Sequence, residues 1–314
     1  MVAGPFLSEG LAVVPRVLGL ADRQEDSPTY GCCDRAYWHY RTTDFPNVRF
    51  QEAGLLFALA HGLDHPGNRF HAKPAMARWA RAAWRFWLGR RNRDGSFAEA
   101  YPGDRGFCGT SFSAAAFVET VRLLGGAEAW AGELAAAAPS FAWLAANDNP
   151  EVANQRAGSV WALAGYARLT GDGALEKTAR IRLNDLLCGM DGEGWFPEYG
   201  GGDTGYQSIT MAALVLAGDW LGHGEALSGA LTRAETALAS RLRPDGRVAD
   251  IAANSRGTQF VYPSALVRRR SPVATALTRG LAEDVILRPA WMDDRYCIAL
   301  AIDHLMAGRE TAPC

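Results

Sequence analysis

Apolar residues recur along this chain at intervals of three and four, the spacing of helices, and strand-like alternation is almost absent. Residues 74–89 are the clearest case, because apolar positions on one face alternate with arginines on the other. Proline in a first turn, in two cases after a capping residue, predicts helix starts at Pro74, Asn149-Pro150 and Ser271-Pro272. The pattern predicts an all-α fold.

Glycines that follow apolar runs predict where these helices end. They are Gly62, Gly125, Gly171, Gly189, Gly222 and Gly308. A glycine-rich segment also recurs with its positions in register: GSFAE begins at Gly95 and GWFPE at Gly194, 99 residues apart, and each continues to an Asp-x-Gly-aromatic run. A weaker third copy begins at Gly246, 52 residues after the second. The chain is therefore built from units of about fifty residues.

Polar and aromatic segments follow this interval, at 44–52, 94–110, 147–156, 193–207, 245–259 and 289–296. A strongly apolar helix is expected after each, at 54–60, 113–124, 159–169, 209–221, near Val261 and at 297–306. Arg-rich amphipathic helices such as 74–89 and 225–242 lie between them. Two helices per unit predict helical hairpins, in which the apolar helix can be buried on all sides. Six such hairpins predict an (α/α)6 toroid, with an open solenoid of the same hairpins as the alternative.

The length of 314 residues would ordinarily suggest two domains. Six units of about fifty residues account for nearly the whole chain, however. We therefore expect one domain over residues 1–314, in which residues 1–40 form an N-terminal arm or first helix that leads into the ring.

Charge and composition exclude some classes of binding partner and some locations. With 32 Lys and Arg against 34 Asp and Glu, the net charge of -2 provides no overall basic field for a nucleic acid. Apolar stretches are far below the roughly 20 residues of a membrane span, and the amino terminus lacks the pattern of a signal peptide, so a cytoplasmic location is expected. Six cysteines without a CxxC pair predict reduced thiols. We expect no metal and no cofactor, and the oligomeric state stays open.

If the apolar helices form an inner ring, the polar segments gather on one face, where converging helix amino termini favour an anionic ligand. Aromatic rings beside carboxylates, amides and arginines suit a saccharide, because a pyranose offers C–H faces to rings and hydroxyls to polar groups. The candidate substrate-binding residues are Arg41, Arg49, Gln51, Tyr101, Asn154, Trp195, Tyr199, Asp203, Gln207, Arg256, Tyr262, Asp293 and Asp294.

Hydrolysis of a glycosidic bond is one chemistry that these segments suggest. Glu99 and Glu198 are the candidate acid and base, because they occupy equivalent positions of the repeat. The same recurrence is also what residues that merely hold a turn would show.

β-Elimination from a uronate is the other chemistry. Asn154 or Arg256 would neutralise the substrate carboxylate, and a tyrosine or histidine would remove the C5 proton. His39, Tyr40 and Tyr206 are the candidates for that base.

Segments such as DGSFAEAYPGD and EGWFPEYGGGDTGYQ give the chain a resemblance to the helical-toroid domains of glycan-active enzymes. The heparinase II/III-like and alginate-lyase toroids are the most similar in pattern, and the similarity covers the hairpins over most of the chain. Those families typically carry an Asn-His or His-Tyr catalytic signature, which His39-Tyr40 matches here. The resemblance implies an enzyme that acts on an acidic, uronate-type saccharide as a lyase or hydrolase.

Two other classes remain open. Terpenoid cyclases and prenyltransferases also use helical toroids, and ten Trp and nine Tyr are enough to line a pocket that steers carbocations. Their DxDD motif does not occur, however, and Asp293-Asp294 and Asn184-Asp185 only approximate their magnesium motifs. A noncatalytic helical-repeat binding protein is the third hypothesis.

Overall fold

The computed structural model describes residues 3–308, and the predicted all-α class is confirmed there. Extended pairing within this range is limited to isolated bridges. The α-helices are α1 Ala3–Ala12, α2 Val14–Leu20, α3 Ala53–Gly62, α4 Pro74–Gly89, α5 Phe107–Leu123, α6 Gly126–Ala129, α7 Ala131–Ala146, α8 Ala153–Thr170, α9 Gly173–Cys188, α10 Thr204–Leu221, α11 Glu225–Ser240, α12 Ser264–Arg268, α13 Pro272–Ala282 and α14 Asp294–Met306. Short 3-10 or π turns are η1 Ala36–Tyr40, η2 Val48–Glu52, η3 Ile251–Ala253 and η4 Pro289–Trp291.

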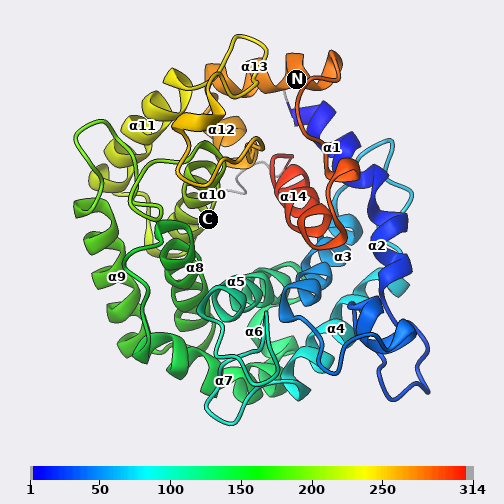
Figure 1. The fold of residues 1–314 in the computed structure, drawn as a ribbon. Coiled ribbons are helices and arrows are strands. Elements are labelled where there is room, and N and C mark those ends of the chain that lie inside the picture. The colour runs from blue at the N-terminus through cyan, green and yellow to red at the C-terminus, as the bar shows by residue number, and fades with distance from the viewer. Residues whose placement is uncertain (1–2, 309–314) are drawn as a thin grey trace.

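The helices form an inner and an outer set (Figure 1). The inner set contains α3, α5, α8, α10 and α14, and the outer set contains α2, α4, α7, α9, α11 and α13. Contacts pass from α3 to α5, α8, α10, α12 and α14 in turn, and α14 contacts α3 again. Because α1 also packs against α14, the first and last helices lie together.

Burial separates the two sets. In α3 and α10 nearly every residue is buried, whereas α4 and α11 bury one face. Apolar residues all round a helix require neighbours all round it, which only the inside of the molecule supplies. The prediction that apolar helices alternate with amphipathic ones is therefore confirmed by their burial.

Several predicted helix boundaries need correction. α5 and α8 begin six residues before the predicted Ser113 and Ser159, because their first turns fall within the segments 94–110 and 147–156, which were not expected to be helical. The predicted cap at Asn149 is wrong: Val152 precedes α8, and Asn149 donates to the side chain of Gln155. The helix expected near Val261 is the short α12. The predicted start at Ser271-Pro272 is confirmed.

The repeated glycines make a close contact between successive units. Gly31, Gly95, Gly194 and Gly246 all have positive φ, between 77° and 106°. A Cβ added to any of them would lie 2.1 to 3.0 Å from a backbone atom of the next outer helix. Those atoms belong to Ala82 of α4, Pro139 of α7, Arg233 of α11 and Leu277 of α13. The repeat therefore marks turns that only glycine fits. The repeated sequence pattern did not identify Gly31.

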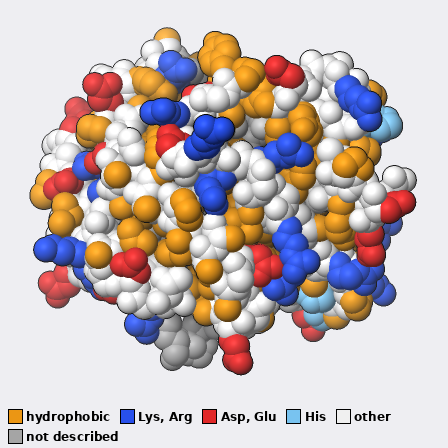
Figure 2. All heavy atoms as spheres, turned by 90° about the horizontal axis from the view of Figure 1, so that it is seen from below, with side chains coloured by type: hydrophobic (Ala, Val, Ile, Leu, Met, Phe, Trp, Pro, Cys, Tyr) orange, Lys and Arg blue, Asp and Glu red, His pale blue; other side chains and the backbone are white. Residues whose placement is uncertain are grey.

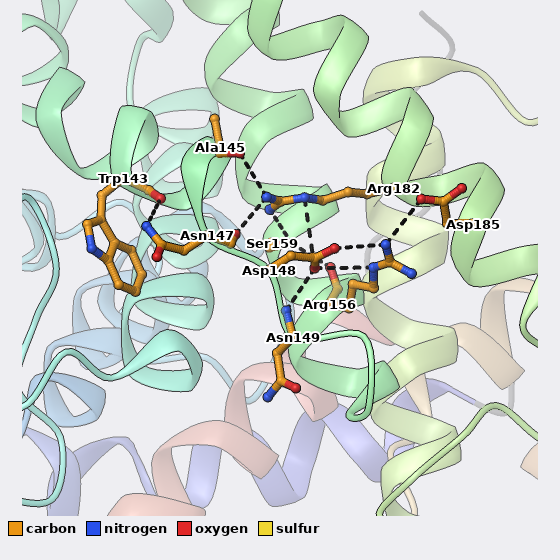
Figure 3. A network of polar contacts seen from close by, with 9 residues as sticks. All are labelled: Trp143, Ala145, Asn147, Asp148, Asn149, Arg156, Ser159, Arg182 and Asp185. Atoms are coloured by element: carbon orange, nitrogen blue, oxygen red, sulfur yellow. Dashed lines mark hydrogen bonds and ion pairs between the residues drawn. The ribbon is translucent and has the colours of Figure 1, made fainter.

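A polar network joins α7, α8 and α9 (Figure 3). Arg182, only 5% exposed, donates to the carbonyl oxygens of Ala145 and Asn147 at the end of α7. Burial lowers the pKa of Arg182. Asp148 lies beside it and pairs with Arg156 at 2.8 Å. The buried guanidinium thus satisfies carbonyls that a helix C-terminus leaves without partners.

Acidic and basic side chains are interspersed among apolar ones on the face drawn in Figure 2. This mixture is in keeping with the net charge of -2. Across residues 3–308, no helix has both the length and the apolarity that crossing a bilayer requires.

Candidate functional site

A cavity of about 320 Å³ lies among the inner helices. The first turns of these helices and the loops before them supply most of its polar side chains, and the following turns supply its apolar ones together with Asp303. We call the two parts the polar end and the apolar end. The polar end includes Arg49, Glu99, Asn154, Tyr206, Arg295 and Tyr296. The apolar end includes Leu55, Phe112, Ile209, Leu216, Ile302 and Met306.

Two ion pairs line the polar end. Arg49 pairs with Glu52, and Arg295 of α14 pairs with Glu99 at 2.5 Å. The guanidinium of Arg49 also lies 3.2 Å from the sulfur of Cys108. Burial raises the pKa of Cys108 to about 12 although Arg49 opposes the shift. Cys108 is therefore a neutral thiol at physiological pH, which disfavours it as a nucleophile.

Glu198 lies behind the cavity wall and is only 2% exposed. One carboxylate oxygen accepts from Nδ2 of Asn154 at 2.6 Å, and the other from the backbone N–H of Asn154 at 3.5 Å. Burial raises the pKa of Glu198 to about 7, while the hydrogen bonds from Asn154 lower it. Because Asn154 lines the cavity and Glu198 does not, Glu198 acts by holding the Asn154 amide in place.

Two tyrosines from different helices meet at the polar end. Burial raises the pKa of Tyr206 on α10, and a hydrogen bond to Tyr296 on α14 raises it further. Either hydroxyl can be the donor in this hydrogen bond, because a phenol both donates and accepts. Tyr262 lines the cavity beside them, and burial raises its pKa as well.

Tyr199 and Arg256 lie at the edge of the same cavity. The guanidinium of Arg256 is 4.4 Å from the centre of the Tyr199 ring, a cation–π contact. Asp203 fixes this arrangement, since it accepts the backbone N–H groups of Arg256 and Tyr206. The Tyr199 hydroxyl is hydrogen-bonded to Gln155.

The structure brings together a part of the predicted site. The predicted residues that line the cavity are Arg49, Glu99, Asn154, Tyr199, Tyr206 and Tyr262. Glu198 contacts the lining residue Asn154, and Arg256 contacts the lining residue Tyr199. These eight come from segments spread over most of the chain, as expected if the polar segments share one face.

Three predicted binding residues instead hold the backbone, and a fourth is packed in the interior. The Gln51 amide donates to the carbonyl oxygens of Gly31 and Ala83. The Gln207 amide donates to the carbonyl oxygen of Gly194, which is the equivalent bond. Both amides are buried and do not line the cavity. The remaining two are Trp195, which is buried under Arg241, and Asp203, which caps α10.

The other predicted residues lie outside the cavity lining. His39 and Tyr40 belong to the turn η1 and Arg41 ends it; the Tyr40 side chain is exposed. Tyr101 is 74% exposed. Asp293 caps α14, and Asp294 pairs with Arg16 on the outside of that helix. The His39-Tyr40 dipeptide thus has no contact with the cavity through which to act as a catalytic signature.

Sequence reasoning missed the contribution of α14. Arg295, Tyr296, Ile302, Asp303 and Met306 all line the cavity from one helix. Their spacing of three, four and seven residues was the available signal, because it places them on one helical face. Asp303 is buried and accepts the backbone N–H and hydroxyl of a serine in α12, and burial raises its pKa to about 7.

Across residues 3–308, no group of three or more His, Cys, Asp or Glu side chains is arranged to hold a metal ion. No protein-family model matches this chain, and no curated protein matches it either. Its function must therefore be argued from the cavity and the side chains that line it.

Proposed function

We propose that the fold is an (α/α)6 toroid and that the chain is an enzyme acting on an acidic, uronate-type saccharide by β-elimination. The return of the helix contacts from α14 to α3 supports the closed ring over an open solenoid. One observation carries the reaction: the hydrogen-bonded pair Tyr206 and Tyr296 shares the polar end with Asn154, whose amide is held by the buried Glu198.

The elimination needs a group that binds the carboxylate, a base at C5 and a proton donor for the leaving oxygen. The Asn154 amide binds the substrate carboxylate, and the Tyr296 hydroxyl oxygen takes the C5 proton while its own proton passes to Tyr206. The electrons of the C5–H bond form the C4=C5 double bond, and the C4–O4 bond breaks. Tyr206 gives its own proton to O4 as it receives that of Tyr296 along their hydrogen bond, so both phenols end protonated. This restores the starting state.

Hydrolysis by Glu99 and Glu198 has less support. An acid and a base must both reach the glycosidic bond from opposite sides. Glu99 lines the cavity, but Glu198 is buried behind Asn154 and uses both carboxylate oxygens to bind it. The two glutamates, although equivalent in the repeat, are not both available to a substrate.

The Tyr296→Phe variant tests the reaction. We expect it to lower kcat by about 10²–10⁴, the usual contribution of a general base. The measurement is the ultraviolet absorbance of the unsaturated product, with alginate, polygalacturonate and hyaluronan as substrates. Tyr40→Phe is the matched comparison, because it removes a tyrosine hydroxyl outside the cavity. If Tyr40→Phe abolished turnover and Tyr296→Phe did not, the proposed site would be wrong.

The apolar end favours a second candidate, an enzyme that acts on an isoprenoid. Its side chains cannot form hydrogen bonds with the hydroxyl groups of a sugar, but they suit a hydrocarbon chain. They include Leu55, Phe112, Ile209, Leu216 and Met306. Thermal-shift assays separate the candidates, because a ligand that binds the folded state raises Tm. Stabilisation by isoprenyl diphosphates and by none of the uronate saccharides would favour the isoprenoid enzyme.

A cytoplasmic location belongs to the same proposal. The cysteines within residues 3–308 are free thiols, and the neighbouring Cys32 and Cys33 are both buried. Reduced, unpaired cysteines are typical of reducing compartments.

A further inference from the structure

The cavity among the inner helices changes its chemistry along its length. On α10, Tyr206 lines the polar end, and Leu216, ten residues later, lines the apolar end. Tyr296 and Met306 of α14 have the same spacing. The hydrogen bond between the two tyrosines shows that both helices begin at the same end of the cavity. Because an α-helix rises 1.5 Å per residue, the lining extends about 15 Å from the polar end to the apolar end.

Trp161 and Asp303 lie among the apolar lining residues, but their polar atoms already have partners within the protein. Nε1 of Trp161 donates to the carboxylate of Glu119 at 3.0 Å. One carboxylate oxygen of Asp303 accepts the backbone N–H of Ser264 at 2.9 Å, and the other accepts the hydroxyl of the same serine. A polar group of a ligand would therefore lose its hydrogen bonds with water at the apolar end and find few replacements. An apolar group is favoured there instead.

The positive and negative side chains at the polar end balance each other. Arg49 pairs with Glu52, and a second ion pair joins Arg295 to Glu99. A guanidinium has five N–H donors and a carboxylate has several lone pairs, so paired groups can still bind the hydroxyls of a sugar. A diphosphate carries several negative charges and would need unpaired cations or a metal ion. The polar end therefore suits a head group with one carboxylate and several hydroxyls.

We propose that the cavity binds an amphiphilic acidic glycoside, with a uronate ring at the polar end and an apolar aglycone at the apolar end. This rests on the proposed function and narrows its substrate to a uronate that carries an apolar group. The cavity of about 320 Å³ is near the lower limit for a small-ligand site, which suits one uronate ring with a short aglycone. One ligand of this kind accounts for both ends of the cavity.

Isothermal titration calorimetry of the full chain with methyl, butyl and hexyl β-D-glucuronides tests the proposal without requiring turnover. Each added methylene that enters the apolar end should lower Kd about fourfold. From the methyl to the hexyl glycoside we therefore expect Kd to fall by on the order of 10²–10³. Hexyl β-D-glucoside has the same chain without the carboxylate, and it should bind at least about tenfold more weakly than the hexyl glucuronide.

The variant Ala299→Phe places a ring between the two ends. Ala299 lines the cavity and is not fully buried, so the added ring enters the cavity space. It should reduce the change in Kd from methyl to hexyl glucuronide to less than about tenfold. Ala138→Phe, at an exposed position of the outer helix α7, is the matched control and should keep the full change. If circular dichroism shows Ala299→Phe unfolded, Ile302→Thr replaces it, because its hydroxyl at the apolar end should weaken hexyl binding about threefold.

Three results would overturn the amphiphilic ligand. They are equal Kd values for the methyl and hexyl glucuronides, a hexyl glucoside that binds as tightly as the hexyl glucuronide, and a geranyl diphosphate that binds more tightly than either. The outcome is separable from that of the elimination. A Kd that depends on chain length, without any unsaturated product, supports the amphiphilic ligand while the elimination falls. Product from polygalacturonate, with a Kd that does not depend on chain length, supports the elimination while the amphiphilic ligand falls.

Discussion

The loops that begin at Gly95 and Gly194 have the same turn but place their glutamates in different surroundings. In one, the N–H of Asn92 donates to the carbonyl of Ser96; 99 residues later, Asp191 donates to Trp195 in the same way. Glu99 of the first loop lines the cavity and pairs with Arg295. Glu198 of the second is buried, bound to Asn154, and has a pKa raised to about 7.

The difference comes from partners outside the repeat. Arg295 arrives from α14 and brings a charge to Glu99, whereas Asn154 arrives from α8 and brings a neutral amide to Glu198. A repeat can therefore reproduce a backbone while the neighbours of each copy decide the chemistry of an identical side chain. This explains why repeat equivalence alone suggested an acid–base pair that the cavity does not contain.

The largest loss of stability should come from changing the glycine turn that the two loops share. Gly95→Ala places a Cβ 2.3 Å from the carbonyl oxygen of Pro139 at a φ of +106°, so we expect a loss of about 3–5 kcal/mol of unfolding free energy. Gly103→Ala, in the same loop with a φ of +73° and open space around it, should cost only about 1 kcal/mol. Urea denaturation measures both. Equal costs would show that positive φ, and not the contact between units, requires the glycine.

The next largest effect tests the surroundings of Glu198. Its folded-state pKa of about 7 exceeds the ordinary 4.5, so the folded chain binds the proton more tightly than the unfolded chain does. Stability therefore falls as pH rises from about 4.5 to 7, by on the order of 3 kcal/mol for this group. Glu198→Gln should remove that slope, as measured by urea denaturation at several pH values.

Asp303 shares the direction of this shift, since burial also raises its pKa to about 7. It remains in both proteins, so the difference between the two pH profiles isolates Glu198. Parallel profiles for wild type and Glu198→Gln would mean that Glu198 is not the buried titrating group.

A smaller difference is expected between the equivalent aspartates of the two loops. Asp203 accepts the backbone N–H groups of Tyr206, Arg256 and Thr258, whereas Asp104 accepts two weaker bonds within its own loop. Asp203→Ala should lower Tm by an amount equivalent to about 2 kcal/mol, and Asp104→Ala by less than about 1 kcal/mol. The reverse order would show that the loop containing Asp104 carries more of the fold's stability.

The smallest effect should come from Glu99. Glu99→Gln loses the ion pair with Arg295 but keeps a side-chain oxygen, so we expect a cost of about 1 kcal/mol that shrinks in high salt. Glu151→Gln, a substitution at an exposed glutamate, serves as the control. A cost that does not change with salt would indicate that packing, not charge, is what Glu99 provides.

Spacing predicted the fold well where structure is local. The helix over 74–89 and the repeated glycines could be predicted because helical periodicity and positive φ act over a few residues. The starts of α5 and α8 were misplaced because their first turns fall within the segments 94–110 and 147–156, which were interpreted as loops. Cys108 of α5 and Asn154 and Gln155 of α8 line the cavity.

The site was less predictable, because polarity does not reveal what a side chain contacts. Gln51 and Gln207 look like ligand-binding amides in the sequence, but both satisfy backbone groups that burial would otherwise leave unpaired. Asp293-Asp294 looked like part of a motif for magnesium, whereas the nearby Tyr296 lies against Tyr206 because of its place on α14. Each assignment depends on a partner far away in the chain.

The sequence by itself determined most of the helices, the fifty-residue unit and the positive-φ turns, because helical periodicity and backbone conformation depend on residues close together in the chain. Only the tertiary structure decided which polar residues face the cavity and how they ionise. Glu99 meets Arg295 across 196 residues and Asn154 meets Glu198 across 44, and no local pattern encodes such pairs. Burial and neighbouring charge set the pKa of a group, and both exist only once the helices have packed.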